Sequence, residues 1–365
     1  MNEKKAPSTL VVGFALFSMF FGSGNLIFPL MLGAKYQAYF YVCVAGFVIT
    51  AVLLPTLGIM AMIPARGRFE KLFDGLVKPE MARWFFLLVL IFWIPLGSGP
   101  RCVLLAHASI STYFIYTPPI LIFSLLFLIL VYICVLNRGR LIDILGKALT
   151  PLLLISISAM VISSFSGGYM GQSSYQPFDI FIASLVDGYY TQDLIAAIFF
   201  SSALVTMLHQ SMSNTRQIMK KTWRGGLLAV AMLAIIYGAL MASSAIHGEY
   251  LQGLSGDRLV AAMAHIALGS TLGGISSLAV SLACFTTEIA LVVVMADFLS
   301  AKFLGLRYGK YAIGLTLSVI WMLSLLDFAG LMTIIAPAMQ VIYPVLFFLV
   351  LRLLWRTRSQ IRSHQ

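Results

Sequence analysis

Apolar stretches of about twenty residues recur from one end of this chain to the other, separated by short polar segments. A stretch of that length and composition crosses a lipid bilayer as an α-helix. The pattern therefore predicts an all-α polytopic membrane protein with about ten transmembrane helices. The expected spans are 10–32, 37–62, 84–110, 118–136, 148–166, 180–207, 226–247, 274–300, 311–326 and 329–352.

Two of these stretches are interrupted by polar residues and glycines at their centres. The first span holds Gly-Ser-Gly-Asn at 22–25, and the sixth holds Asp-Gly at 187–188 and Thr-Gln-Asp at 191–193. Glycine weakens a helix, and backbone groups freed inside hydrocarbon must find other partners. Both spans are therefore predicted to be discontinuous helices, the device with which secondary transporters bind their solutes at mid-membrane.

Composition excludes several classes of protein. Of 365 residues, 60% are hydrophobic and only 10% are charged, which is too little polar surface for a soluble protein of this size. The first apolar run is too long for a signal peptide and ends in Phe-Pro-Leu, without a small-residue cleavage site. The four cysteines lie singly within apolar runs, so we expect small buried side chains and neither a metal site nor a disulfide framework.

The net charge of +11 is explained by its distribution. All Lys and Arg residues except Lys35, Arg101 and Arg258 fall before the first span, in every second connection after it, or at the C-terminal end of the last span and beyond. The positive-inside rule then predicts that both termini are cytoplasmic. Membrane lipid accounts for the basic charge, and no nucleic acid is expected as a partner.

Ten spans divide into two halves of five, and an odd number of spans gives the halves opposite orientations, as in an inverted repeat. The interrupted spans are the first of each half. The expected units are a first repeat at 1–166, an external linker at 167–179, a second repeat at 180–354 and a basic cytoplasmic tail at 355–365. The mostly apolar segment 258–269 is expected either to lie over the external mouth or to extend the eighth span.

Several segments resemble the bacterial branched-chain amino acid:cation symporter family. The stretch Gly-Phe-Ala-Leu-Phe-Ser-Met-Phe-Phe-Gly-Ser-Gly-Asn-Leu-Ile-Phe-Pro at 13–29 is similar to that family's first-span signature. Further resemblances are Asp-Gly-Tyr-Tyr-Thr-Gln-Asp-Leu-Ile-Ala-Ala at 187–197, Leu-Ala-Cys-Phe-Thr-Thr-Glu-Ile-Ala at 282–290, Gly-Pro-Arg at 99–101 and Tyr-Pro at 343–344. The resemblance implies uptake of leucine, isoleucine and valine across the bacterial inner membrane, coupled to Na⁺ in preference to H⁺. It also implies the five-plus-five fold of the neurotransmitter sodium symporters.

The chain departs from the family pattern in three places. The sixth-span motif begins with Asp187 where the family usually has Glu. The acidic residue that usually follows Pro-Arg is absent, and His107 lies in that region. The family usually has about twelve spans, whereas ten are predicted here.

A zwitterionic aliphatic substrate at mid-membrane needs donors for its carboxylate, acceptors for its ammonium group and an apolar pocket. Backbone amides at the start of the second half of span 1 suit the carboxylate, and unwound carbonyls of span 6 suit the ammonium group. The alternatives are close helix packing for the glycines and ordinary core packing for the aromatic residues. The expected substrate-binding residues are Phe20, Gly22, Ser23, Gly24, Asn25, Asp187, Gly188, Tyr189, Tyr190 and Phe285.

A sodium ion is expected between spans 1 and 8, as the resemblance implies. Its predicted ligands are carbonyls from Ser18 to Phe21 and the hydroxyls of Thr286 and Thr287. The alternative is that these Ser and Thr hydroxyls bond back to their own helices. No other metal and no organic cofactor is expected.

The few charges inside the spans are costly in lipid and should face protein or water. Arg101 and Glu288 lie in the third span of each half and are expected to form a structural ion pair. Arg101 could instead bind the substrate carboxylate. Asp187 would neutralise the substrate amine or carry a proton, and Asp193 would cap the second half of span 6.

Other functions fit the sequence less well. A symporter of the same fold for another apolar amino acid, such as methionine, remains the nearest alternative. An intramembrane aspartyl protease would need aspartates in two spans, but Asp187 and Asp193 share one. Nothing resembles the repeated filter of a channel, and no Walker motif is present for ATP-driven transport.

Overall fold

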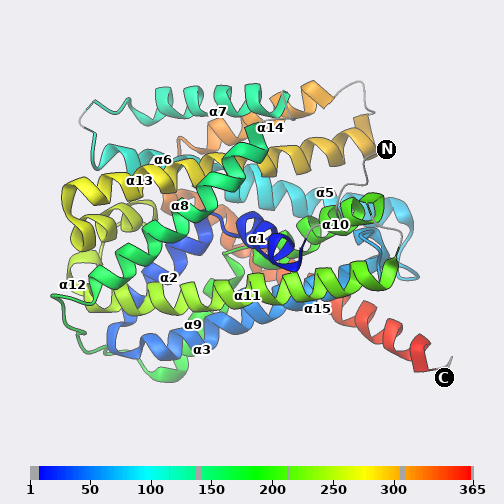
Figure 1. Ribbon diagram of the computed structural model, residues 1–365, viewed down its shortest axis with the longest axis horizontal. Coiled ribbons are helices and arrows are strands. Elements are labelled where there is room, and N and C mark those ends of the chain that lie inside the picture. Colours follow the sequence, from blue (N-terminus) through cyan, green and yellow to red (C-terminus); the bar gives the residue numbers. More distant parts are fainter. Residues whose placement is uncertain (1–7, 115, 137–140, 212–213, 305–308, 363–365) are drawn as a thin grey trace.

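The computed structural model describes residues 8–114, 116–136, 141–211, 214–304 and 309–362, and within these ranges all regular structure is helical (Figure 1). Six helical stretches are long and apolar enough to cross a membrane. They are Ser23–Met62, Pro79–Ser111, Pro177–His209, Arg216–Ile246, Gly256–Phe303 and Phe328–Thr357. Shorter apolar helices cover Thr9–Phe20, Ile120–Leu136, Pro151–Ser164 and Gly309–Leu323. The protein is therefore the polytopic helical membrane protein that the hydropathy pattern predicts.

The helices of the first half are α1 (Thr9–Phe20), α2 (Ser23–Tyr36), η1 (Gln37–Tyr39), α3 (Phe40–Val48), η2 (Ile49–Leu53), α4 (Leu54–Met62), η3 (Phe69–Phe73), α5 (Pro79–Trp93), η4 (Ile94–Ser98), α6 (Gly99–Ser111), α7 (Ile120–Leu136) and α8 (Leu141–Ser164). Those of the second half are α9 (Pro177–Tyr189), α10 (Asp193–Ser211), α11 (Thr215–Ile246), α12 (Gly248–Leu251), α13 (Gly256–Leu299), η5 (Ser300–Leu304), α14 (Gly309–Leu323) and α15 (Phe328–Arg362).

Both predicted interruptions are present. Span 1 is divided into α1 and α2, and span 6 into α9 and α10. Spans 2 and 3 each contain a π-helical turn, η2 and η4, that the sequence did not predict. A π turn inserts one extra residue into a helical turn and often marks a functional site. Each of these two turns lies against the interruption in span 6, as the contacts described below show.

Two predicted helix ends differ from the structure by ten residues or more, and the structure also bears on the two alternatives for segment 258–269. Helix α11 begins at Thr215 and not at 226, and α15 continues to Arg362 beyond the predicted end at 352. In both cases the helix runs on through basic residues, which water solvates readily. Segment 258–269 is not a straight extension of span 8, because Gly269 has φ 71° and ψ −166° and kinks α13 there. On the far side of that kink, Tyr113 Oη donates to the Ala261 carbonyl at 3.4 Å.

Glycines make the contacts among spans 1, 2, 6 and 7. An added Cβ at Gly33 of α2 would lie 2.1 Å from Ser244 Oγ of α11, and one at Gly46 of α3 would lie 2.6 Å from the Phe181 carbonyl of α9. Small residues let helix backbones approach closely in lipid, where dispersion contacts hold helices together. Gly13 and Gly225 play the same part between α1 and α11. These glycines therefore let the four spans pack closely against one another.

The two ends of the molecule differ in charge. At one end Arg83 donates to the Lys302 carbonyl, and Lys302 pairs with Glu70 at 2.7 Å, so loops from both halves meet there. At the other end the linker meets η1 and α12: Ala38 N–H donates to the Gly171 carbonyl at 3.2 Å, and Tyr169 Oη donates to Glu249 Oε1. Figure 1 shows α12 at the left and the red C-terminal part of α15 projecting at the right. Five basic residues of the predicted charge pattern lie outside the described residues: Lys4, Lys5, Arg138, Arg140 and Arg307.

Candidate functional site

The interruption in span 1 opens the start of a helix at the centre of the protein. Helix α1 ends at Phe20, Phe21 and Gly22 are extended, and α2 begins at Ser23. Gly22 has no side chain with which to cap α2, and its own N–H donates to Asn25 Oδ1 at 2.9 Å. The first amides of a helix have no acceptor within it, and they carry partial positive charge. Ser23 and Gly24 therefore present the kind of amides that bind a carboxylate.

The interruption in span 6 is short and strained. Helix α9 ends at Tyr189, and α10 begins four residues later at Asp193. Gln192 between them has φ 65°, a conformation that non-glycine residues adopt only when surrounding contacts enforce it. Those contacts come from span 3: Gln192 Oε1 accepts hydrogen bonds from Ser98 Oγ at 2.8 Å and from Arg101 Nη2 at 2.5 Å.

The two interruptions touch each other. An added Cβ at Gly24 would lie 3.2 Å from Thr191 Cα and 3.3 Å from the Thr191 carbonyl oxygen. An added Cβ at Gly24 would be in tight contact with Thr191, so this glycine favours close approach of the two backbones. The packing interpretation and the binding interpretation of Gly24 are therefore compatible. The symmetry-related breaks form one site, although they lie far apart in the sequence.

A buried carboxylate joins the two breaks. Asn25 Nδ2 donates to Asp193 Oδ1 at 2.8 Å and to Oδ2 at 2.9 Å, and Tyr237 Oη donates to Asp193 Oδ2 at 2.6 Å. The Asn25 amide also contacts Tyr237 Oη. The carboxylate accepts these bonds from α2 and α11. The prediction that Asp193 caps its own helix is therefore wrong, because its oxygens point to other helices. Asp193 N–H instead donates to Thr191 Oγ1 at 3.3 Å.

The predicted ion pair between Arg101 and Glu288 is not formed. Arg101 is fully buried and donates from Nη1 to the Tyr190 carbonyl at 2.6 Å, in addition to its bond with Gln192. Among the described residues, neither carboxylate oxygen of Glu288 has a hydrogen-bond partner. The guanidinium is directed to the break in span 6 because the unwound carbonyl of Tyr190 needs a donor.

The carbonyls predicted to receive the substrate ammonium group already have partners in this conformation. Tyr190 O accepts from Arg101, and Gly188 O accepts from Thr191 Oγ1 at 2.9 Å. Asp187 O and Tyr189 O accept the N–H groups of Tyr190 and Gln192. Each carbonyl has two lone pairs, so a second donor remains possible at these atoms.

Asp187 and Gly188 are neighbours in the sequence but contact different parts of the protein. Gly188 packs on the π turn η2, where an added Cβ would lie 1.9 Å from Thr50 Oγ1. Asp187 is half-buried and interacts electrostatically with Lys35 at the end of α2. Its carboxylate lies outside the network of Asn25, Asp193 and Tyr237.

The predicted sodium ligands do not all face the break in span 1. Ser18 Oγ and Thr286 Oγ1 donate to carbonyls of their own helices, those of Ala15 and Ala283, both at 3.0 Å. Thr287 faces the break instead, since an added Cβ at Gly22 would lie 3.5 Å from its Cγ2 and 3.9 Å from the Phe20 carbonyl. The structure thus brings Thr287 and the end of α1, next to Phe21, into one place.

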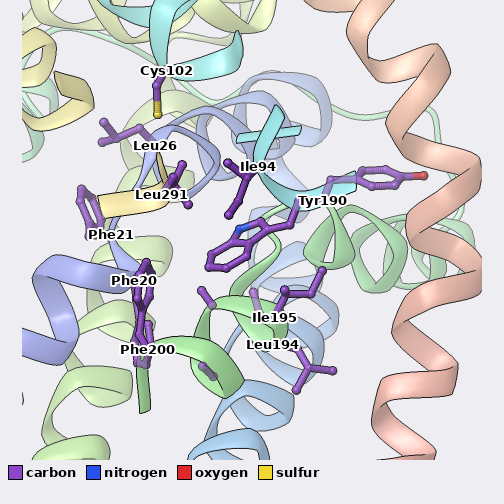
Figure 2. Packing of buried hydrophobic residues seen from close by; sticks show 14 of the residues in the cluster. Phe20, Phe21, Leu26, Ile94, Cys102, Tyr190, Leu194, Ile195, Phe200 and Leu291 are labelled. Carbon is purple, nitrogen blue, oxygen red and sulfur yellow. The ribbon is translucent and has the colours of Figure 1, made fainter. Parts of the chain in front are cut away.

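Three of the four predicted pocket aromatics lie near the breaks. Phe20 faces Phe200 of α10 with ring centroids 6.5 Å apart (Figure 2). Tyr190 packs against Phe28, and Tyr189 against Tyr343. Phe285 does not join them: it packs on Phe127 of α7 with centroids 5.4 Å apart. Successive helix residues point about 100° apart, so Phe285 and Thr287 project from different faces of α13.

Comparison with known proteins identifies the chain. The sequence model of the branched-chain amino acid transport protein family matches residues 5–364. The chain belongs to this family. A Staphylococcus saprophyticus protein named as a branched-chain amino acid carrier is 31% identical, the match covering 95% of this chain and 81% of the relative. A similarly named Staphylococcus haemolyticus protein is 32% identical, with coverages of 95% and 82%.

Solved structures with the same fold are transporters. The transporter MhsT in complex with L-phenylalanine has a TM-score of 0.61 at 19% identity, with 93% of this chain and 87% of MhsT covered. The nucleobase-cation-symport-1 family transporter Mhp1, closed around bromovinylhydantoin, has a TM-score of 0.60 at 17% identity, with coverages of 95% and 80%. This member of the branched-chain amino acid transport protein family therefore has the five-plus-five inverted-repeat fold with discontinuous first and sixth spans. It is a transporter and not an enzyme.

Four residues of this family member's site were not among the sequence-based candidates: Ser98, Thr191, Gln192 and Tyr237. Gln192 is a buried amide inside an apolar span, and that polarity is a signal of a functional position. Tyr237 lies in an otherwise ordinary apolar helix, so no sequence signal marks its contact with Asp193.

Proposed function

We propose that the protein is a secondary symporter that takes up leucine, isoleucine and valine together with a cation by alternating access. The observation that carries the proposal is the contact between Gly24 and Thr191, which joins two helix interruptions inside the membrane. Family membership supports the substrate class, since the relatives are named as branched-chain amino acid carriers. The proposed location is the bacterial inner membrane, with both termini cytoplasmic and lipid around the spans.

In this proposal the substrate carboxylate binds the amides of Ser23 and Gly24 at the start of α2. The ammonium group binds carbonyls at the ends of α1 and α9, where helix dipoles place partial negative charge. The branched side chain contacts Phe20 and Tyr190. The bundle of spans 1, 2, 6 and 7 then rocks against the remaining spans around this fixed site, as expected for inverted-repeat transporters.

The coupling cation is proposed to be Na⁺ in preference to H⁺. Thr287 and the carbonyls between Ser18 and Phe21 supply neutral oxygens at a helix end with partial negative charge. The back-bonded hydroxyls of Ser18 and Thr286 are the weaker ligands of the set.

Uptake of radiolabelled leucine into proteoliposomes tests the proposal. An imposed inward Na⁺ gradient should drive leucine accumulation, and a pH gradient alone should drive much less. Valine and isoleucine should compete with leucine at similar concentrations. Competition by methionine alone would assign the protein to the alternative substrate. No accumulation under either gradient would refute cation-coupled uptake of these amino acids.

A further inference from the structure

Two arginines near the end of α15 converge on one point of the loop that joins spans 2 and 3. Arg352 Nη2 and Arg356 Nη1 both donate to the Asp74 carbonyl oxygen, at 3.0 and 2.6 Å. The two donating nitrogens therefore lie within roughly 6 Å of each other. Gly75, with φ 72°, turns the loop so that its backbone rests against both guanidinium groups.

The arrangement concentrates positive charge. The two guanidinium groups share the backbone carbonyl oxygen of Asp74 as an acceptor, and guanidinium forks match the geometry of phosphate oxygens. The loop carries two acidic residues: Glu70 pairs with Lys302 at 2.7 Å, and the side chain of Asp74 is exposed. A phosphate is therefore a complementary ligand for this position.

The outer face of α15 shows where the lipid surface lies. Val341, Phe348 and Trp355 follow one another at seven-residue intervals and are 66%, 61% and 78% exposed. Residues with this spacing share one face of a helix and span about 20 Å along it. Large exposed apolar side chains in a membrane protein face lipid tails, and tryptophan marks the boundary with the headgroups.

The arginine pair and the tryptophan that ends the exposed apolar face lie at the same level along α15. Trp355 lies between Arg352 and Arg356 in the sequence, and the C-terminal part of α15 projects from the body of the molecule (Figure 1). The arginine pair is thus at the depth where lipid phosphates lie. We propose that Arg352, Arg356 and the backbone of Asp74–Gly75 form a binding site for the headgroup of an anionic phospholipid, which holds the loop between spans 2 and 3 against α15.

Binding of fluorescent phosphatidylglycerol to the purified full-length protein in detergent tests the site. Unlabelled phosphatidylglycerol should displace the probe at concentrations about tenfold lower than phosphatidylcholine. The R352Q/R356Q variant should bind the probe about twentyfold more weakly, because it loses the charge-assisted hydrogen bonds to the lipid phosphate. The matched control is R216Q/K220Q, which removes two cations with the same spacing from exposed positions on α11.

Three results would overturn the proposal. The wild-type protein could show no preference for phosphatidylglycerol over phosphatidylcholine, a measurement that does not depend on any variant folding. The R352Q/R356Q and R216Q/K220Q variants could lose the same affinity, which would indicate general attraction by surface charge. Inorganic phosphate at millimolar concentration could displace the probe as well as the lipid does, which would indicate a site for free phosphate.

Discussion

At the scale of single residues, the site depends on Asp193. This carboxylate accepts hydrogen bonds from both Asn25 and Tyr237, so one residue connects the breaks of spans 1 and 6 to span 7. The bonds are buried and involve a charged acceptor, which makes them stronger than neutral hydrogen bonds. Removing the charge should therefore loosen the contact that shapes the substrate site.

Asp193→Asn should reduce leucine uptake by tenfold or more and lower the thermal stability of the purified protein by about 2 kcal/mol. The asparagine amide would face the Asn25 amide and present a donor where an acceptor is needed. The matched control is Asp179→Asn, an exposed position in the first turn of α9. Equal uptake by both variants and the wild type would show that the network is dispensable.

Gly24→Leu should abolish uptake while the protein still reaches the membrane. The side chain would start 3.2 Å from Thr191 Cα and push the two breaks apart. Gly238→Leu is the control, because an added Cβ there meets nothing within 4 Å. Uptake assays with immunoblotting of membranes measure both variants, and normal transport by Gly24→Leu would remove the assigned site.

Some features of these site residues could be predicted from the sequence and others could not. The cluster at 22–25 was recognisable because glycines and an asparagine are costly within an apolar span. The direction of the Asp193 and Arg101 side chains was not predictable, because it depends on which helices pack beside them. A buried polar group takes the partner that tertiary packing provides, and a sequence does not show that partner.

At the scale of helices, α13 presents different chemistry on each face. Thr287 faces the end of α1, Thr286 bonds its own backbone, and Phe285 packs on α7. Of these three consecutive residues, Thr287 is the one whose side chain lies beside the break, with its methyl carbon toward Gly22. The contacts of a residue on this helix are thus determined by the face on which it lies, and residues that are adjacent in the sequence make different contacts.

Thr287→Ala should raise the Na⁺ concentration for half-maximal leucine uptake by about tenfold, the loss expected for one hydrogen-bond-strength contact to a charged group. Thr286→Ala should leave it nearly unchanged, since that hydroxyl is satisfied by Ala283. Measuring uptake across a series of Na⁺ concentrations compares the two directly. The same Na⁺ dependence in both variants would place the cation elsewhere.

Arg101 links the third span to the sixth span by hydrogen bonds. Its guanidinium binds the Tyr190 carbonyl and the side chain of Gln192, which fixes the strained turn before α10. Arg101→Lys keeps the charge but loses the fork that reaches both acceptors. We expect a loss of about 2–4 kcal/mol of stability and a strong loss of uptake.

Thermal unfolding in detergent, with Arg216→Lys as an exposed control, checks this expectation. An unfolding midpoint for Arg101→Lys equal to that of the control would contradict the role of the guanidinium fork.

At the scale of the whole molecule, the four-span bundle depends on glycines. Gly33→Val should destabilise the protein by about 3 kcal/mol and reduce its yield, because the new side chain would collide with Ser244 and the Met241 backbone. Gly314→Val is the control, since an added Cβ there meets nothing within 4 Å. Comparable yields and unfolding temperatures for the two variants would argue against a rigid bundle.

The global arrangement was more predictable than the site. Hydropathy and the alternation of basic connections gave the membrane spans, and the positions of two polar clusters gave the symmetry of the breaks. The kink at Gly269 and the continuation of α15 to Arg362 were not predicted, because composition does not separate a helix that crosses lipid from one that continues beyond it.

The central claim is a substrate site between the start of α2 and the ends of α1 and α9. A density map of the protein with bound leucine tests it most directly. We predict leucine between the two breaks, with its carboxylate within about 3 Å of the Ser23 and Gly24 amide nitrogens. Leucine bound elsewhere, with Gly24 and Thr191 still in contact and no ligand between α1 and α2, would contradict it.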